Sequence, residues 1–134
     1  MIPWFILKSI DGVRPEEIEF IREEGIQKIY DDAREDCKLR GLDYEDLVHK
    51  DVFGDLGTSF MFMPCKYPYL LEEGVNHYVL WLNPIYDWGE DIDLIVSGII
   101  EQIMGDVEFG WLENRVEDRS ILGIRHFHIF FKNS

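Results

Sequence analysis

The residues best suited to chemistry lie near the C-terminal end, in the stretch from Arg125 to Phe131 (RHFHIFF). Side chains of a β-strand point alternately to its two faces. On a strand, Phe127, Ile129 and Phe131 would face a hydrophobic core. His126 and His128 would then lie side by side on the other face. Imidazoles can exchange protons near neutral pH, bind a metal or attack a phosphorus atom. We therefore predict a functional site on this strand, with His126 and His128 as candidate catalytic residues.

A third histidine, His77, occupies another stretch with strand character, Val75 to Leu82. Two histidines separated by one residue on a strand can give one metal ion two ligands, and His77 would supply a third. No acidic residue has a spacing that identifies a fourth ligand, which leaves Cys65 as a candidate. The alternative is a polar strand face whose imidazoles bond to neighbours or to solvent. The spacing does not decide between these interpretations, and we predict no resident metal and no cofactor.

The composition indicates one globular domain, 1–134, with a substantial core: 134 residues, 46% apolar and 14% aromatic. Cys37 and Cys65 have no metal-ligand spacing and indicate free thiols. We therefore expect an intracellular, reducing compartment, cytoplasmic or nuclear. No apolar run is long enough to span a membrane, and the run from Ile2 to Leu7 is too short for a signal peptide.

The net charge of −14 argues against a general nucleic-acid-binding protein, because the phosphate backbone would be repelled. Residues 11–55 contain 15 acidic and 7 basic side chains, whereas residues 111–134 contain three acidic and four basic ones. The histidine end is thus the part of the sequence that we expect to attract an anion. The acidic helices of the first half would suit a basic protein partner.

Hydrophobic periodicity predicts an α+β domain in which helices at 1–50 cover a mainly antiparallel sheet at 58–132. Before the sheet, we expect a short strand or arm at Trp4–Ile10, a helix at Pro15–Lys38 that Gly41 ends, and a second helix that Asp43 caps. The remaining elements follow in order: strands at 58–63 and 75–82, a helix at 90–104 that Gly105 ends, strands at 107–111 and 124–131, and a polar loop at 113–123 before the last strand.

Asn114, Ser120, His126 and His128 together resemble a degenerate form of the histidine-triad (HIT) signature. In that superfamily a strand with an entry histidine, here His77, precedes a helix and a strand that leads to an asparagine. A loop of small residues and a last strand of alternating histidines follow. Residues 58–132 have this order, so the resemblance implies a β-β-α-β-β core and leaves the first fifty residues unexplained.

The HIT resemblance implies nucleotide phosphate chemistry, in which a central histidine attacks the α-phosphate and forms a phospho-histidine intermediate. The family has three alternating histidines and this chain has two. If His128 is the central one, Phe130 replaces the phosphate-binding histidine. If His126 is central, Ile124 replaces the first histidine and His128 binds phosphate. We favour the second register, because it keeps both groups nearest the chemistry.

Two further segments, Tyr67 to His77 and His126 to His128, are similar to segments of an uncharacterised domain-of-unknown-function family in fungal and large-virus proteins. That family implies no established activity. The resemblance to this family therefore indicates a relationship but implies no reaction.

Three functions compete. The first is a hydrolase or transferase acting on a nucleotide-like small molecule. Its substrate-binding candidates are His77, Asn114, Ser120, Arg125, Trp81 and Tyr69, with Arg115 and Arg119 as further phosphate partners. The second is a non-catalytic interaction domain, whose aromatic excess would also be compatible with a homo-oligomer. The third is a metal enzyme that uses the three histidines.

Overall fold

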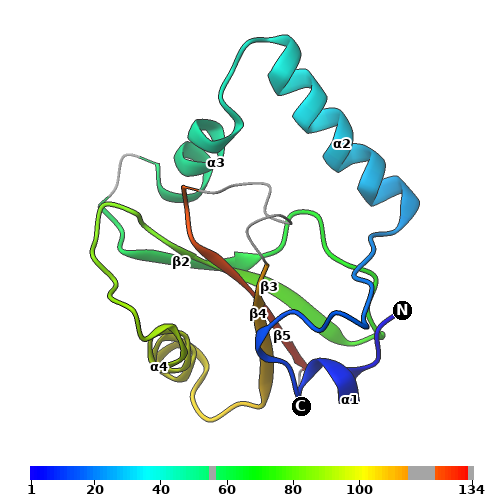
Figure 1. The fold of residues 1–134 in the computed structure, drawn as a ribbon, viewed down its shortest axis with the longest axis vertical. Helices are drawn as coiled ribbons and strands as arrows, with labels where there is room; N and C mark the ends of the chain where they lie inside the picture. The colour runs from blue at the N-terminus through cyan, green and yellow to red at the C-terminus, as the bar shows by residue number, and fades with distance from the viewer. Residues whose placement is uncertain (55–56, 115–122, 133–134) are drawn as a thin grey trace.

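Five strands form one mixed sheet in the computed structural model, which describes residues 1–54, 57–114 and 123–132. Three pairings are antiparallel, and β1 pairs with β4 in parallel (Figure 1). The strand order across the sheet is β1-β4-β5-β3-β2. The strands are β1 (Asp11–Val13), β2 (Phe60–Pro64), β3 (Val75–Leu82), β4 (Phe109–Glu113) and β5 (His126–Lys132); the helices are α1 (Trp4–Leu7), α2 (Glu24–Leu39), α3 (Tyr44–Phe53) and α4 (Ile92–Met104). The predicted α+β class is confirmed, and β2, β3, α4, β4 and β5 follow one another in the predicted order.

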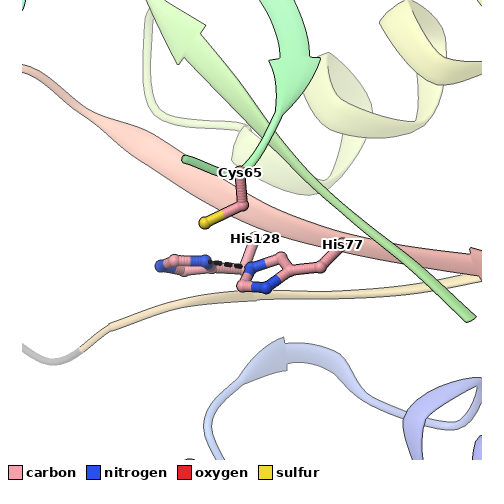
Figure 2. A group of neighbouring side chains, drawn as sticks. All are labelled: Cys65, His77 and His128. Carbon is pink, nitrogen blue, oxygen red and sulfur yellow. Dashed lines mark hydrogen bonds between the residues drawn. The ribbon is translucent and has the colours of Figure 1, made fainter. Parts of the chain in front are cut away.

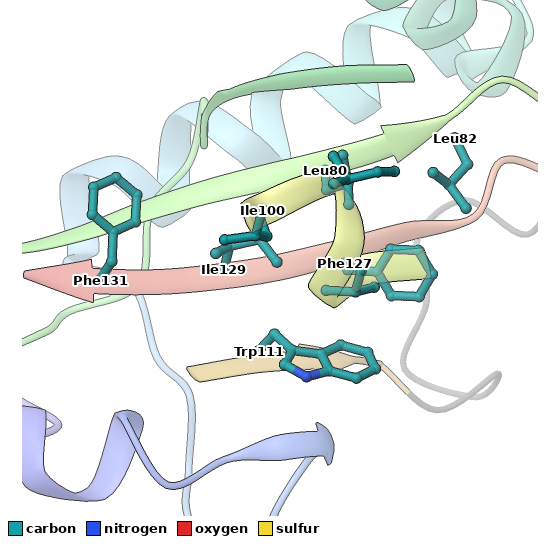
Figure 3. Close-up of a cluster of buried hydrophobic side chains, with 9 residues drawn as sticks. Leu80, Leu82, Ile100, Trp111, Phe127, Ile129 and Phe131 are labelled. Carbon is teal, nitrogen blue, oxygen red and sulfur yellow. The ribbon is translucent and has the colours of Figure 1, made fainter. Parts of the chain in front are cut away.

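One face of the sheet packs against α4 (Figures 1 and 3). Val96, Ile99 and Ile100 of α4 meet side chains that alternate along β3 and β5. The predicted inward-facing residues of the last strand, Phe127, Ile129 and Phe131, belong to this core; Phe127 and Ile129 have no exposed surface. Burying each such side chain contributes roughly 1.5–3 kcal/mol to stability. The predicted alternation of β5 is therefore correct.

The opposite face carries the histidines, and β5 lies between β3 and β4 there. His126 pairs with Trp81, and His128 lies between Val79 of β3 and Leu112 of β4. Directly opposed residues share a face of the sheet. This register therefore places the two predicted catalytic histidines beside the side chains of β3 and at the end of β4.

Two apolar clusters cover parts of the histidine face. One joins α1 and the following N-terminal residues to Leu112 and Phe130. The other joins α3 to Ile124, to β2 and to Trp81 of β3. The helix α2 lies on the same side (Figure 1) but buries only Cys37 of its own residues. A space between α2, α3 and the sheet is therefore lined rather than filled by side chains.

The expected helix at Pro15–Lys38 begins nine residues late, at Glu24. Tertiary contacts explain the difference: Phe20 is buried against Phe130, and the amide of Leu70 donates to the carbonyl of Ile21 at 2.7 Å. The burial of Phe20 and this non-local bond hold residues 15–23 away from helical geometry. Local propensity is a weaker influence than such packing.

Of the two alternatives for Trp4–Ile10, a strand or an arm, the strand is wrong. Trp4–Leu7 is one turn of α-helix that follows Pro3, whose carbonyl accepts from the amides of Ile6 and Leu7. This turn lies directly on β4 at Gly110, where a Cβ atom would overlap the carbonyl of Leu7. The close approach thus requires glycine.

Asp11–Val13, which directly follows this segment, forms β1 and pairs in parallel with β4. The predicted helix ends are confirmed where they depend on local chemistry. Asp43 accepts from the amides of Glu45 and Asp46 at the start of α3. Gly105 ends α4 with a φ of 73°. Among the described residues, no helix is long and apolar enough to cross a membrane.

Candidate functional site

His77 and His128 form a buried pair in the middle of the sheet (Figure 2). Nε2 of His77 lies 2.7 Å from Nδ1 of His128, and the two residues are 7% and 6% exposed. Burial lowers the pKa of His77 to about 3, with a smaller effect from the Arg22 charge. Burial, followed by the neighbouring His77, also lowers the pKa of His128 well below its ordinary value. Both rings are therefore neutral at physiological pH, and each carries one proton.

The hydrogen-bond network assigns the position of both protons. The backbone amide of Tyr69 donates to Nδ1 of His77 at 3.1 Å, so this nitrogen carries a lone pair and the proton of His77 is on Nε2. Nε2 then donates to Nδ1 of His128. The proton of His128 must consequently be on Nε2. His128 therefore presents an N–H donor on the side of the ring that points away from His77.

Nε2 of His128 lies 3.3 Å from Nδ2 of Asn114, the residue that follows β4. Oδ1 of Asn114 accepts from Nη1 of Arg14 at 3.1 Å, and this bond fixes the orientation of the amide. The contact between His128 and Asn114 thus brings two donors together. The 3.3 Å separation leaves no room between the two nitrogens, but an anionic oxygen beside this contact can accept from both. We call Arg14, Asn114 and His128 the donor cluster.

His126 has the opposite tautomer. Its Nδ1 lies 3.0 Å from the carbonyl oxygen of Ile124, which can only accept. In the neutral ring the proton is therefore on Nδ1, and Nε2 carries the lone pair. The ring stacks on Trp81 with a centroid distance of 4.6 Å. His126 thus offers a nucleophilic or basic nitrogen, whereas His128 offers a donor.

A cavity of about 1050 Å³ lies between the sheet and the helices α2 and α3. Its lining includes the predicted site residues His126, His128, Asn114, Tyr69 and Trp81. Counted over the described residues, the lining also contains six basic and three acidic side chains, a formal balance of +3 in a chain of −14. The basic residues are Arg14, Arg22, Arg34, Arg40, Lys50 and Lys66.

The positive lining corrects the expectation that the histidine end alone would attract an anion. Five of the six basic residues come from the acidic first fifty residues of the sequence. These five basic side chains line the cavity, whereas among the acidic side chains of the same segment only Asp31 and Asp36 do. Charge summed along the sequence cannot show this separation.

Cys65, His77 and His128 offer three ligand atoms within 4.8 Å of one another (Figure 2). The predicted metal site had His77, His126 and His128 as ligands and Cys65 as the candidate for a fourth; the structure groups Cys65 with His77 and His128. A metal on Nε2 of His77 would require a proton on Nδ1, where the amide of Tyr69 already donates. Burial also raises the pKa of the Cys65 thiol, which disfavours the thiolate. This arrangement therefore does not fit a resident metal.

Arg125, a predicted phosphate partner, forms a two-bond ion pair with Glu113 at 2.7 and 2.9 Å. Its guanidinium lies 5.6 Å from the ring centre of Phe127, and it is absent from the cavity lining. Because it precedes His126 on the chain, its side chain points to the opposite face. The predicted residues Ser120, Arg115 and Arg119 lie outside the described residues.

His77, predicted to bind the substrate, instead forms a hydrogen bond with His128 and does not line the cavity. Sequence reasoning missed Arg14 and Arg22, which no motif marks. Arg14 reaches Asn114 across 100 positions of sequence. No local pattern could have indicated that contact.

No family model matches the chain, and no curated protein matches it. The crystal structure of HTC1 is similar to this protein, with a TM-score of 0.62 and 17% sequence identity. The match covers 86% of this chain and 77% of that one. At this identity it shows a common fold.

Proposed function

We propose that this protein is a hydrolase or transferase that acts on a nucleotide-like phosphate compound, with His126 as the nucleophile. The supporting observation is the bond between Nδ1 of His126 and the carbonyl of Ile124. It directs the lone pair of the ring to Nε2 in a residue that lines the cavity. An imidazole nitrogen that carries its electron pair rather than a proton is the form that attacks phosphorus.

His128 and Asn114 would bind the phosphate oxygens. The N–H on Nε2 of His128 and the amide of Asn114 supply two donors, and Arg14 adds a positive charge beside them. Fixed donors stabilise the extra negative charge that develops on phosphate oxygens during attack. These roles agree with the register in which His126 is central and His128 binds phosphate.

The proposed reaction has two steps. Nε2 of His126 forms a bond to phosphorus while the bond from phosphorus to the leaving group breaks, and the leaving group takes the electron pair. Water or a second substrate then attacks the phosphorus, returns the electron pair to Nε2 and gives up one proton to solvent. Trp81, which stacks on His126, would hold the ring in place.

The cysteines support an intracellular setting for this chemistry. Cys37 and Cys65 are free thiols, as expected in a reducing compartment. The resemblance to the HIT superfamily is part of the same proposal, since it rests on the order of the elements and on these residues.

The test uses adenosine phosphoramidate and a dinucleoside polyphosphate as substrates for three variants. We expect His126→Asn to lose at least about a hundredfold in turnover, because the nucleophile is absent. We expect His128→Gln, which keeps an N–H donor, to lose less than His128→Ala. His49→Gln, a histidine change outside the cavity lining, serves as the control and should retain full activity.

Equal turnover of His126→Asn and the unchanged protein would overturn the proposal. So would the absence of turnover of both substrates by the unchanged protein. In the second case a non-catalytic binding domain becomes the better description, and charge reversal on α2 would test a basic partner.

A further inference from the structure

A second group of cations lines the cavity on the side of α2. Arg22 lies over the ring of Tyr30 at 4.3 Å and over that of Tyr69 at 5.1 Å. Arg34 lies 5.8 Å from the ring centre of Tyr30 and 5.2 Å from that of Tyr44. Stacking on aromatic rings restricts a guanidinium group without neutralising its charge. We call Arg22, Tyr30, Arg34 and Tyr44 the arginine–tyrosine wall.

Neither arginine of the wall forms an ion pair with a carboxylate in the described residues. Nε of Arg22 donates to the carbonyl of Tyr67 and Nη1 donates to Gln27. Nη1 of Arg34 donates to the hydroxyl of Tyr30. Both guanidinium groups therefore keep their full charge, and each has N–H groups beyond those in these bonds. An arginine has five donors in a planar fork, which suits phosphate.

Two other cations of the same cavity differ in this respect. Arg40 pairs with Asp36 at 3.4 Å, and Lys66 lies 3.9 Å from Asp51. Among the described residues on this side of the cavity, the uncompensated charge is carried by the two arginines of the wall and by Lys50 of α3. Arg22 is also held in place. It donates to the carbonyl of Tyr67, and the carbonyl of the preceding residue, Ile21, accepts from the amide of Leu70, so both bonds hold it against the segment that contains Tyr69.

The wall continues from the donor cluster through Tyr69. The ring of Tyr69 lies 5.3 Å from that of His128, and Arg22 covers Tyr69. Tyr30 then connects Arg22 with Arg34. The cavity therefore has a cationic region at the histidines, which Arg22 also borders, and a further cation, Arg34, which lies on α2 beyond the ring of Tyr30.

We infer that the arginine–tyrosine wall is a second anion-binding subsite, and that the ligand carries at least two linked phosphate groups. This inference rests on the proposed function, in which the first phosphate binds at the donor cluster. It gives the helical N-terminal segment, which lies outside the HIT-like half, a part in substrate recognition. A compound with one phosphate, bound at the donor cluster, would place no negative charge beside the two arginines of the wall.

The experiment measures the binding of orthophosphate and of tripolyphosphate by calorimetry, without any turnover. We expect the unchanged protein to bind tripolyphosphate at least about tenfold more tightly than orthophosphate, since each added charge-assisted contact contributes about that factor. Arg34→Gln should weaken tripolyphosphate binding at least about fivefold and leave orthophosphate binding unchanged. Arg34 is exposed, so its replacement leaves the core intact.

Arg40→Gln is the matched control, because Arg40 lines the same cavity but is paired with Asp36. It removes the same charge and should change neither affinity by more than about twofold. Equal affinity for the two anions would overturn the inference, as would equal effects of Arg34→Gln and Arg40→Gln.

The two proposals fail separately. Preferential binding of tripolyphosphate that depends on Arg34 supports the wall even if no substrate is turned over. Turnover that depends on His126, with no preference for tripolyphosphate, retains the chemistry and removes the second subsite.

Discussion

The ring of His77 determines which nitrogen of His128 carries its proton. The amide of Tyr69 occupies one nitrogen of His77, and the other nitrogen donates to His128 at 2.7 Å. Because both rings are buried and neutral, the arrangement fixes one N–H of His128 toward Asn114. A backbone amide thereby decides the chemistry of a side chain on another strand.

The buried histidine pair predicts a pH dependence of stability. The pKa of His77 falls from 6.5 to about 3 on folding, so the unfolded chain binds a proton that the native protein excludes. The free energy of unfolding should therefore decrease as the pH falls from about 6.5 toward 3. The slope from one such histidine approaches about 1.4 kcal/mol per pH unit.

Urea unfolding between pH 7 and pH 5 measures this slope, in a range where most carboxylates remain ionised. The variant His77→Gln should have a slope shallower by up to about 1.4 kcal/mol per pH unit. An unchanged slope in this variant would contradict the neutral assignment of His77. His49→Gln is the control for loss of a histidine outside the pair.

The orientation of Asn114 predicts the effect of a charge at the donor cluster. Asn114→Asp replaces the donating amide with a carboxylate beside Arg14 and His128. The new charge should repel phosphate and lower orthophosphate affinity at least about tenfold, whereas the ion pair with Arg14 keeps the fold. Calorimetry with orthophosphate measures the change. Asn76→Asp adds the same charge outside the cavity lining and should have less than about a twofold effect.

We expect that adding one methyl group at Gly110 lowers the stability of the protein strongly. A Cβ atom there would overlap the carbonyl of Leu7, so Gly110→Ala should destabilise the protein by about 3 kcal/mol or more. The comparison is Gly98→Ala within α4, where an added Cβ meets no atom within 4 Å. Alanine favours the helix, so this variant should gain about 0.5–1 kcal/mol. Thermal and urea unfolding of both variants would measure the difference, and similar stabilities would contradict the packing of α1 on β4.

The proton positions predict a low metal content. Protein purified without a histidine tag should contain less than about a tenth of an equivalent of zinc, because the Tyr69 amide opposes the protonated Nδ1 that a zinc-bound His77 needs. Elemental analysis would measure the content. Stoichiometric zinc that disappears in Cys65→Ser would show that the donor geometry rearranges to hold the ion.

The sequence by itself determined the features that depend on neighbouring residues. The alternation in β5 assigned Phe127 and His128 to opposite faces of the sheet, and the apolar run of β3 indicated a strand covered on both faces. Asp43 and Gly105 indicated the start of one helix and the end of another. These signals operate within a few residues, because side-chain direction and helix capping depend on the local backbone.

Only the tertiary structure decided the features that depend on distant contacts. Burial of Phe20 overrode the helical pattern after Pro15. The bond between His77 and His128 joins residues 51 positions apart in the sequence, and the bond between Arg14 and Asn114 joins residues 100 positions apart. The tautomers and the charge of the cavity follow from those contacts. The tautomers could not be predicted from the sequence, because the position of a proton on an imidazole depends on which donor or acceptor faces each nitrogen.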